Sequence, residues 1–595
     1  MQITPTIKQG FCAIIKVMEH KNNIENIRHS LAHLLGASIM ELYPGSKITL
    51  GPAIDNGFYY DVDVEGKITD ADLNKIEKRM KQIIKNWKTF EKKIFTKDEA
   101  LKFFEGNEYK TELINEISEK GEEITVYQSG DFADLCRGGH VENIKDIPLD
   151  AFKIDRVAGA YWRGDEKNKM LTRIYGLAFE TKEKLDAYII QQEEAKKRDH
   201  RKLGKELDLF CFSDLVGPGL PLFTPKGTAM RDAIVDKIES IQKKLGYQKV
   251  TIPHITKKDL YETSGHWEKF GDELFKVKGK DSEFVMKPMN CPHHTQIYAS
   301  KPRSYKELPV KYVETTMVYR DEQKGELLGL SRVRSISQDD GHVFCTPEQV
   351  KDEIKNIILV IKEFYSSLDM WNEDTVKVFL SVRDPKTPEK YMGESSDWDN
   401  SEKALEDIIK EEKLPYTIDE GEAAFYGPKL DFKFKDAIGR EWQLATVQLD
   451  FNMPKRFELE YVDSDGVKKT PVMIHRAIAG ALERFLSVII EHFAGNFPVW
   501  LSPVQVIILP ISEKQSEYAN SVYEKLKEQD IRVELDNSNE SLGKRIRNAK
   551  VQKTPYIIVI GDKEKEDKTI TVEAREEKLE GIKIEEFLER IEKES

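Results

Sequence analysis

Three potential metal ligands, far apart in the sequence, place the strictest demand on the fold of this chain. Cys291 lies in the segment MNCPHH, His342 in QDDGHVF and His475 in VMIHRAI, and both histidines border short apolar runs typical of strands. One thiolate and two imidazoles leave the fourth position of a tetrahedral zinc ion open, which is the arrangement of a working metal site rather than a structural one. A fold that makes such a site must bring the three residues together.

The residues around these ligands are suited to a nucleotide. Arg320 and Glu322 flank a hairpin that contains glycine, and Arg484 follows His475 by nine residues on a predicted helix. Spacing alone leaves the site undecided, because buried cysteines are mostly inert and most histidines are structural or exposed. The pattern nevertheless indicates ATP held beside a metal-bound small molecule.

Longer motifs in this region resemble one family. NCPxH, YRxE followed by RVRxxxQDDxH, and MIHRAI followed by ER are similar to motifs of the threonyl-tRNA synthetases, which are class II aminoacyl-tRNA synthetases. The sequence has no P-loop and lacks the HIGH and KMSKS signatures of class I enzymes. The resemblance implies an α+β multidomain fold, with a class II antiparallel sheet core, an α+β editing domain and a C-terminal α/β anticodon-binding domain. It also implies ATP-dependent ligation of L-threonine to tRNA(Thr) through a threonyl-adenylate, with hydrolytic editing of mischarged seryl-tRNA(Thr).

A chain of 595 residues is too long for one hydrophobic core, and the resemblance suggests where it divides. The expected parts are an editing domain (1–180), a helical linker (181–205), a catalytic domain (206–500) and an anticodon-binding domain (501–595). An amino-terminal β-grasp domain, common in this family, is expected to be absent because there is no room for it before Arg28. The apolar run at 11–18 could form a strand, and residues 26–42 are expected to form an amphipathic helix.

In the catalytic domain the resemblance assigns one group of residues to ATP, which is expected to carry Mg²⁺. The group comprises Arg320 at the α-phosphate, Glu322 at the adenine or ribose, Arg332 at the phosphates and Arg484 at the γ-phosphate. Threonine is expected to bind a zinc ion held by Cys291, His342 and His475. The rest of its pocket comprises Gln338, Asp340, Tyr426 and Gln448.

Two departures from the family pattern lie close to this site. His293 replaces a usual glycine beside Cys291 and could compete as a metal ligand. Leu444 and Ala445 replace a more usual Cys-Gly pair, which would reshape the wall of the pocket. Neither change removes a proposed ligand.

The first domain carries the patterns HxxxH and CxxxH. On spacing alone, three imidazoles and a thiol indicate a second zinc site. The resemblance, carried by HSxAHLLG, GPxIDNGFYYD and DLCRGxH, instead implies metal-free hydrolysis of seryl-tRNA by groups that activate water and bind the ester. The residues it assigns to editing are His29, His33, Lys110, Tyr127, Asp134, Cys136 and His140. A metal at this site stays the alternative, and Gly139 stands where the family usually has proline, which predicts a looser loop before His140.

A zinc-dependent threonine pocket explains why a second, hydrolytic site is needed. A site built around a hydroxyl can exclude valine, which lacks that group, by roughly 10⁴-fold or more. Serine keeps the hydroxyl and lacks only a methyl group, a difference of about 1–3 kcal/mol. That margin is too small for translation, so mischarged serine must be removed afterwards.

Residues 503–595 alternate between apolar strands and helices, a pattern that predicts a small α/β domain with a mixed sheet. It resembles the anticodon-binding domain shared by several class II enzymes. Asn539, Lys553 and Glu564 match anticodon-contact positions, whereas Glu573 departs from the base-reading arginine typical of the family.

Bulk composition limits the partners. The formal net charge is 92 − 105 = −13, so tRNA must bind to local basic patches such as 196–205 and 541–553, each of which could equally be a solvated helix face. The segment 217–253 resembles the first class II motif, which implies a homodimer. Five scattered cysteines form no disulfide framework, no apolar run is long enough to span a membrane, and no signal or transit peptide is evident. The expected location is therefore the cytoplasm.

Three other functions are weighed against this one. Another class II enzyme, such as a prolyl- or seryl-tRNA synthetase, is disfavoured by the DLCRGGH region and by the Cys291 ligand set. An RNA-binding regulator that lost catalysis is disfavoured by the retention of Arg320, Glu322 and Arg484. A zinc hydrolase acting through the first domain would require zinc bound to the histidines and cysteine of that domain.

Overall fold

The structure is a computed structural model that describes residues 5–280 and 282–594, with side chains from residue 23 onward. The chain forms two compact units, Met1–Glu193 and Glu194–Ser595. The boundary lies within helix α5 (Lys182–Arg198). Searched over the described part of the chain, no helix combines the length and the apolar character that crossing a bilayer requires.

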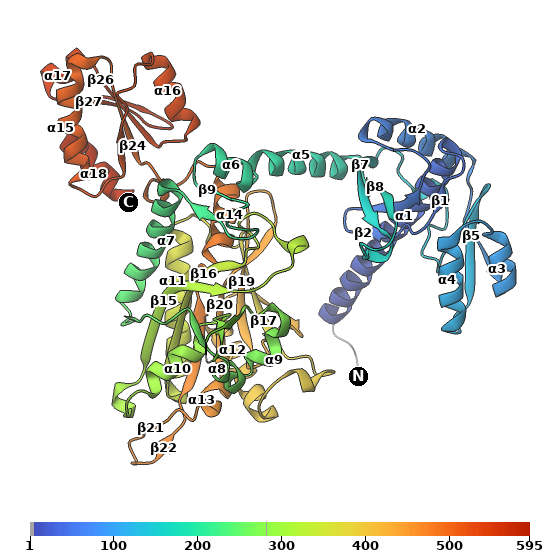
Figure 1. Ribbon diagram of the computed structural model, residues 1–595, viewed down its shortest axis with the longest axis horizontal. Helices are drawn as coiled ribbons and strands as arrows, with labels where there is room; N and C mark the ends of the chain where they lie inside the picture. The colour runs from blue at the N-terminus through green and yellow to red at the C-terminus, as the bar shows by residue number, and fades with distance from the viewer. Residues whose placement is uncertain (1–4, 281, 595) are drawn as a thin grey trace. The chain divides into compact units, whose positions relative to one another are not determined.

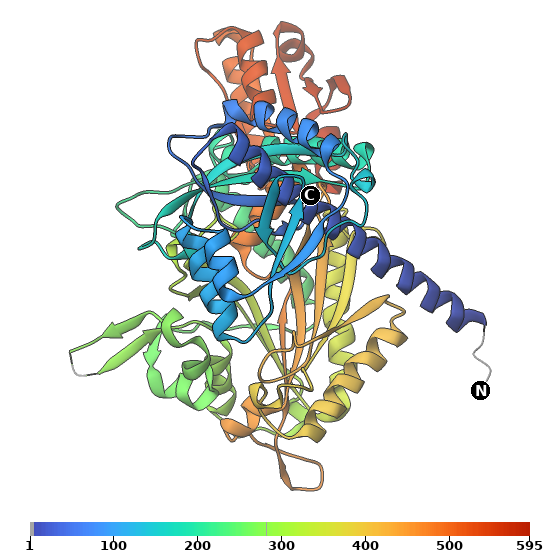
Figure 2. The same cartoon turned by 90° about the vertical axis from the view of Figure 1, so that its right-hand side faces the viewer.

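A single long helix, α1 (Pro5–Leu42), opens the first unit and is drawn in dark blue in Figure 2. Its buried residues Ile27, Leu31 and Leu34 recur at helical spacing, as the sequence pattern predicts. The strand considered for 11–18 is wrong, because the helix runs through that segment. A short apolar run cannot by itself be assigned to a strand or a helix.

The rest of the first unit contains two antiparallel sheets. The larger has the strand order β1-β3-β8-β7 with β2 added to β3, and the smaller has the order β4-β5-β6. Residues Leu31 of α1, Tyr60 of β3 and Ile76 of α2 belong to one buried core, which fixes α1 against the larger sheet. The bounds are β1 (Lys47–Ile48), β2 (Ala53–Ile54), β3 (Gly57–Asp63), α2 (Leu73–Ile83), β4 (Glu91–Phe95), α3 (Lys97–Phe103), α4 (Glu108–Glu119), β5 (Ile124–Ser129), β6 (Phe132–Leu135), β7 (Phe152–Tyr161) and β8 (Met170–Ala178).

The second unit is built on an eight-stranded sheet with the order β11-β15-β16-β23-β20-β19-β17-β18 (Figure 1). Its inner strands are antiparallel, and only the edge strands β11 and β18 pair in parallel. The antiparallel core predicted from the motifs is therefore confirmed. The bounds are β11 (Gln248–Lys249), β15 (Val310–Tyr319), β16 (Ser335–Cys345), β17 (Val376–Val382), β18 (Tyr416–Glu420), β19 (Lys429–Lys435), β20 (Glu441–Asp450) and β23 (Val472–Ala477).

Helices α7, α11 and α14 share the main core of this unit with one face of the sheet. Helix α7 begins where the sequence dictates, because Pro225 occupies its first turn and the Thr224 hydroxyl accepts a hydrogen bond from the Gly227 N–H at 3.2 Å. Helix α10 shares a smaller core with the other face. The bounds are α6 (His200–Glu206), β9 (Phe210–Cys211), β10 (Leu222–Phe223), α7 (Pro225–Lys243), β12 (Ile255–Lys257), α8 (Lys258–Ser264), α9 (His266–Phe270), β13 (Lys276–Lys278), β14 (Glu283–Met286), α10 (Cys291–Ala299), α11 (Val350–Ser366), α12 (Ser395–Glu411), α13 (Asn452–Arg456), β21 (Tyr461–Val462), β22 (Lys468–Lys469) and α14 (Leu482–Phe493).

The end of the chain folds around its own five-stranded mixed sheet, with the order β25-β24-β26-β27-β28. Strand β24 pairs in parallel with β25 and β26, whereas β27 is antiparallel to both of its neighbours. The predicted α/β domain with a mixed sheet is confirmed. The bounds are β24 (Val506–Pro510), α15 (Ser516–Lys527), β25 (Val533–Leu535), α16 (Leu542–Val551), β26 (Tyr556–Ile560), α17 (Asp562–Asp567), β27 (Ile570–Glu573), β28 (Lys578–Ile582) and α18 (Ile584–Lys593).

Candidate functional site

His342 and His475 lie opposite each other on neighbouring strands of the large sheet. They pair in the ladder between β16 and β23, and His475 in turn pairs with Gln448 on β20. Residues directly opposite on adjacent strands project from the same face, so these three side chains form a row across the sheet. Val343, the next residue along β16, projects from the other face into the main core.

Cys291 joins this row from the first turn of α10. The ligand atoms of Cys291, His342 and His475 all lie within 4.8 Å of one another, and all three residues are buried. Burial raises the pKa of the Cys291 thiol well above its usual range. Burial, together with the neighbouring imidazoles, lowers the pKa of His342 and keeps that ring neutral, which is the form that binds metals.

Polar neighbours orient the two histidines. The Nε2 atom of His475 lies 3.0 Å from a carboxylate oxygen of Asp450, which leaves its Nδ1 for another partner. The Nδ1 atoms of His342 and His294 lie 2.7 Å apart. Metal-binding histidines commonly use the second ring nitrogen for such a contact. A buried thiol and two oriented imidazoles therefore fit a zinc ion with one open coordination position.

Two further histidines lie near Cys291. His293, suggested by the sequence as a competing ligand, is not among the grouped donors, and both of its ring nitrogens are buried without a hydrogen-bond partner. The Nε2 atom of His266 lies 3.8 Å from the Cys291 sulfur, and burial lowers the pKa of His266 to about 3. The sequence analysis did not identify His266, because none of the motifs on which it relied includes this residue.

A pocket of about 490 Å³ adjoins the row of side chains. Its lining includes eight residues that the sequence assigned to ATP, threonine or the metal: Arg320, Gln338, Asp340, His342, Tyr426, Gln448, His475 and Arg484. Four polar residues that sequence reasoning missed also line it: Lys429, Gln443, Thr446 and Arg476. Leu444 forms part of the wall, whereas Ala445 is buried in the main core.

Two arginines in this pocket are suited to an anion. The Arg320 guanidinium lies 4.9 Å from the centre of the Phe270 ring, and its buried Nε has no hydrogen-bond partner. The Arg484 Nε donates to the Ser331 carbonyl at 3.1 Å. Burial lowers the pKa of both arginines, which is the mark of charge held away from water without full compensation. A phosphate between them would supply the missing charge.

Glu322 and Arg332 do not line this pocket. The Arg332 Nε donates to the Glu322 carboxylate at 2.8 Å, on the hairpin between β15 and β16. A second carboxylate, Glu326, lies 2.9 Å from the same guanidinium. These two assigned residues therefore neutralise each other in this structure, and a nucleotide would have to compete with that ion pair.

The four histidine and cysteine side chains of the first unit converge. The ligand atoms of His29, His33, Cys136 and His140 lie within 4.8 Å of one another. The Cys136 sulfur lies 3.4 Å from the His29 Nε2 and 3.2 Å from the His140 Nε2. Burial raises the pKa of Cys136 to about 12 and lowers that of His140 to about 3. At neutral pH the thiol is therefore a proton donor and the imidazole an acceptor.

A loop of two glycines presents His140 to this group. Gly138 and Gly139 have φ angles of +99° and +86°. A Cβ on Gly138 would approach the Tyr127 hydroxyl to 2.7 Å. Proline cannot adopt the φ of Gly139, so this backbone conformation is incompatible with proline at this position.

The remaining residues assigned to editing lie beside this group. Lys110 and Asp134 form an ion pair in which both side chains are almost fully buried, and Lys110 also donates to the Thr49 carbonyl at 2.6 Å. The Tyr60 hydroxyl donates to the other Asp134 oxygen. The Tyr127 ring lies 5.1 Å from the His140 ring. A pocket of about 390 Å³ is lined by His29, His33, Asp134 and Cys136, among others.

The three residues assigned to anticodon contacts have different surroundings. Asn539 is exposed in the loop before α16, and Lys553 follows that helix with a φ of +58°. Glu564 caps its own short helix, because its oxygens accept hydrogen bonds from the Gly561 N–H at 2.9 Å and the Thr571 hydroxyl at 2.8 Å. Glu573 pairs with Lys550 at 2.5 Å.

Three family models match the chain. Residues 275–493 match the tRNA synthetase class II core domain (G, H, P, S and T), and residues 505–594 match an anticodon binding domain. Residues 124–175 match the threonyl and alanyl tRNA synthetase second additional domain. The fold and the site thus define a class II aminoacyl-tRNA synthetase.

Curated relatives narrow the class. A threonine–tRNA ligase of Flavobacterium johnsoniae is 49% identical over 95% of this chain and 87% of its own. One from Thermus thermophilus is 48% identical over 92% of this chain and 85% of its own. A solved structure of the RNA binding domain of a Cryptosporidium parvum threonyl-tRNA synthetase is 35% identical, with a TM-score of 0.64, and covers 67% of this chain and 98% of that chain. The chain belongs to the threonine–tRNA ligase family.

Proposed function

We propose that this chain is an enzyme that ligates L-threonine to tRNA(Thr) at the expense of ATP and hydrolyses mischarged seryl-tRNA(Thr) at a second site. The observation that carries the proposal is the convergence of Cys291, His342 and His475 beside a pocket that also holds Arg320 and Arg484. The metal ligands suit an amino acid with a hydroxyl, and the two arginines suit the phosphates of ATP.

Zinc at Cys291, His342 and His475 would supply a Lewis-acidic position for the amine and hydroxyl of threonine. Around it, the Asp340 carboxylate is suited to accept a hydrogen bond from the zinc-bound amine. Gln338, Tyr426 and Gln448 complete the polar wall. Valine has no hydroxyl, so it would leave these buried polar groups unpaired and be rejected.

Activation would join the threonine carboxylate to the α-phosphorus of ATP. A carboxylate oxygen forms the new bond, and pyrophosphate leaves with the electron pair of the broken P–O bond. Arg320 would stabilise the charge at the α-phosphate and Arg484 that at the γ-phosphate, because planar guanidinium groups bind phosphate oxygens in pairs. Mg²⁺ would accompany the departing pyrophosphate. The terminal ribose hydroxyl of tRNA then attacks the carbonyl carbon and releases AMP.

Editing would use the His29, His33, Cys136 and His140 group. The neutral imidazoles can accept a proton from water, and the Cys136 thiol can only donate one, so a thiolate nucleophile is excluded at neutral pH. The Lys110–Asp134 pair would bind the amino group or the ribose hydroxyl of seryl-tRNA. In this proposal the hydrolysis needs no metal.

We extend the proposal to a homodimer and to anticodon contacts at Asn539, Lys553 and Glu564. Exposed apolar side chains gather in the segment before α7, where the first class II motif begins. They are Phe212, Leu215, Val216 and Leu222. A second copy of the chain would cover this surface. The free thiols at Cys136 and Cys291 support a reducing location such as the cytoplasm.

The test is exchange of labelled pyrophosphate into ATP by the purified full chain. We expect exchange that depends on threonine, weaker exchange with serine, and almost none with valine or proline. Silence with threonine combined with activity on another amino acid would overturn the substrate assignment. Charging of tRNA(Thr) with threonine would complete the reaction.

A zinc hydrolase in the first unit is the second candidate, because four potential ligands converge there. Metal analysis of the full chain separates the two. One zinc per chain that is retained when Cys136 is replaced by alanine supports the proposal. A zinc lost with Cys136 would favour the hydrolase.

A further inference from the structure

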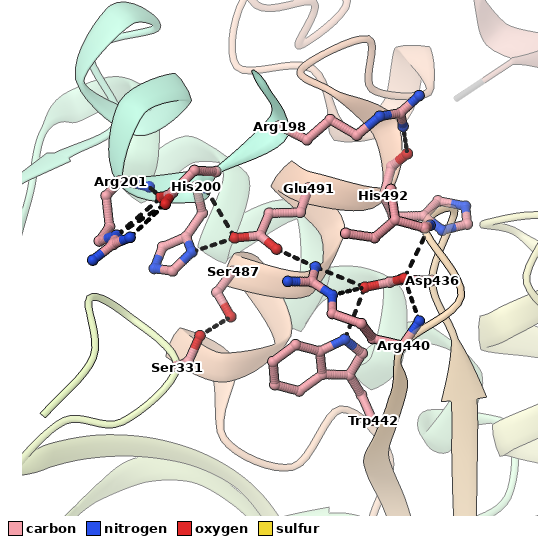
Figure 3. Close-up of polar contacts among 12 residues, drawn as sticks. Arg198, His200, Arg201, Ser331, Asp436, Arg440, Trp442, Ser487, Glu491 and His492 are labelled. Atoms are coloured by element: carbon pink, nitrogen blue, oxygen red, sulfur yellow. Dashed lines mark hydrogen bonds and ion pairs between the residues drawn. The ribbon is translucent and has the colours of Figure 1, made fainter. Parts of the chain in front are cut away.

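His200 occupies a buried position that none of the assigned roles explains. It is the first residue of α6, two residues after α5, and only 3% of it is exposed. Its Nδ1 donates to a carboxylate oxygen of Glu491 on α14 at 2.6 Å, and its backbone N–H donates to the same oxygen at 3.0 Å (Figure 3). The end of the linker is therefore tied to the helix that carries Arg484.

The other ring nitrogen of His200 faces the hairpin between β15 and β16. Its Nε2 accepts a hydrogen bond from the Leu330 backbone N–H at 3.0 Å. An acceptor nitrogen carries no proton, so the proton of the neutral ring must lie on Nδ1, which is the atom that donates to Glu491. One side chain thus bridges two elements through both of its nitrogens.

Gly329 makes this close approach possible. A Cβ on Gly329 would lie 2.2 Å from the His200 Nε2, a distance at which the ring or the hairpin would have to move. The φ of Gly329 is +49°, in the region that favours glycine. The hairpin is therefore shaped to fit against His200.

The same hairpin is fixed to α14 through Ser331, the residue that follows Leu330. The Ser331 and Ser487 hydroxyl oxygens lie 2.9 Å apart (Figure 3), and the Ser331 carbonyl accepts from the Arg484 Nε at 3.1 Å. Arg332 comes directly afterwards and pairs with Glu322. His200, Ser331 and Arg484 therefore hold the part of the hairpin that leads into two residues assigned to ATP.

Glu491 extends this connection to the strands behind the pocket. Its second oxygen pairs with Arg440, whose Nε donates to Asp436 at 2.7 Å (Figure 3). Asp436 also accepts from the Trp442 indole at 3.0 Å. Asp436 and Arg440 lie in the turn between β19 and β20, and β20 carries Trp442 and Gln448. His200 of the linker, α14 and this turn meet at one buried carboxylate.

We propose that His200 is a positioning residue for ATP, which holds the 320–334 hairpin against α14 so that Arg332 and Glu322 meet the nucleotide. The proposal rests on the proposed ATP site, but not on which amino acid is activated. His200 touches no substrate itself and acts through Leu330 and Glu491. Its loss would leave the buried Leu330 N–H without a partner, and the Glu491 oxygen would keep only the backbone N–H of residue 200.

The experiment measures binding of a non-hydrolysable ATP analogue and of threonine to the full chain by calorimetry. His200→Asn can keep the bond to Glu491 but is too short to reach Leu330, so it breaks the bridge on one side. We expect the Kd of the ATP analogue to rise about tenfold, the effect of one net hydrogen bond, while the Kd of threonine stays within twofold. The control is His492→Asn, at the residue that follows Glu491 on α14 and is not part of the bridge. It should leave the Kd of the ATP analogue and the Kd of threonine unchanged.

Gly329→Ala provides a test that leaves the histidine in place. The added Cβ should push the hairpin away from His200 and raise the Kd of the ATP analogue by a similar factor. The double variant, His200→Asn with Gly329→Ala, should bind the ATP analogue no more weakly than either single variant. Both substitutions break the same contact between His200 and the hairpin. An unchanged Kd for the ATP analogue in folded variants would overturn the proposal, as would equal losses for ATP and threonine. Absence of threonine-dependent exchange in the unaltered chain would instead count against the proposed function alone.

Discussion

Cys291, Cys345 and Cys211 are all free thiols, but their surroundings differ. Cys291 is buried against imidazoles, Cys345 is buried in the apolar main core, and Cys211 is exposed. Burial raises the pKa of both buried thiols, so neither is reactive on its own account. Of these three thiols, only Cys291 has neighbours that would share a cation, and this distinguishes it chemically from the other two.

Replacing Cys291 with alanine should remove the bound zinc. We expect metal analysis to fall from about one zinc per chain to well below ~0.2, because two imidazoles alone make a weak site. Threonine-dependent exchange should fall by about 100-fold or more, since the change removes a ligand rather than a neighbour of the metal. Cys211→Ala is the matched control and should keep both. An unchanged zinc content in the Cys291 variant would show that the metal lies elsewhere.

Replacing His29 with alanine should separate charging from editing. We expect hydrolysis of seryl-tRNA to slow by about 10²-fold or more, the usual contribution of a general acid or base, while threonine charging stays the same. The measurements are deacylation of preformed seryl-tRNA and charging with labelled threonine. Glu25→Ala, exposed one turn earlier on the same helix, is the control. Unchanged deacylation in the His29 variant would remove this residue from the editing mechanism.

At the scale of elements, a buried ion pair joins β16 to β23, and the same carboxylate binds the segment before α14. Arg476 donates to Asp339 at 2.6 Å, and both side chains are about 1% exposed. The second Asp339 oxygen accepts from the Ile478 N–H at 2.7 Å and the Ala479 N–H at 3.2 Å. These bonds set the position at which α14, and with it Arg484, leaves the sheet.

Asp339→Asn should therefore destabilise the second unit strongly. It leaves the Arg476 charge buried without compensation, which typically costs about 3–5 kcal/mol. Urea unfolding at neutral pH measures the loss. The control is Glu441→Gln, which breaks an exposed pair with Lys377 and should cost less than about 1 kcal/mol. Equal small effects in both variants would mean that water reaches Arg476.

The pattern of the sequence predicts some elements well and others badly. Strands β24 and β26 are runs of buried aliphatic residues bounded by turns, and such runs follow from local composition. The apolar run at 11–18 is helical instead, because a neighbouring helix extends through it. The pattern of apolar residues in such a run indicates which side chains are buried. It does not indicate whether an adjacent helix continues through the run.

Within the site, eight residues assigned from the motifs line one pocket, but the motifs did not identify the residues that hold them in place. Arg476 and His266 stand beside predicted ligands, yet their partners are distant in sequence. Glu322 and Arg332 were assigned to ATP, and their mutual ion pair depends on the hairpin's conformation. Contacts between side chains that are far apart in the sequence cannot be predicted from the residue types of a single chain.

At the scale of the second unit, Glu491 joins the linker, α14 and the turn between β19 and β20. Burial alone would raise the pKa of Glu491, but hydrogen bonds from His200 and the pairing with Arg440 bring it below its ordinary value. A carboxylate with a lowered pKa in the folded state contributes stability that is complete above its unfolded pKa. That stability is lost as the pH falls through the folded value.

Glu491→Gln should accordingly change how the second unit responds to acid. We expect the variant to be about 2 kcal/mol less stable at pH 7, the value of a hydrogen bond to a charged group. Between pH 5 and pH 3 its stability should fall less steeply than that of the unaltered chain. Urea unfolding at several pH values gives both quantities. Parallel pH curves would show that Glu491 does not titrate differently in the folded state.

The row formed by His342, His475 and Gln448 exists only when β16, β23 and β20 are aligned in register. A shift of one residue in β23 would turn His475 to the opposite face. Residues from the middle and the end of the synthesised chain therefore have to meet before any amino acid can be chosen. A chain in which these strands have not yet paired therefore lacks the row of side chains from which the site is built.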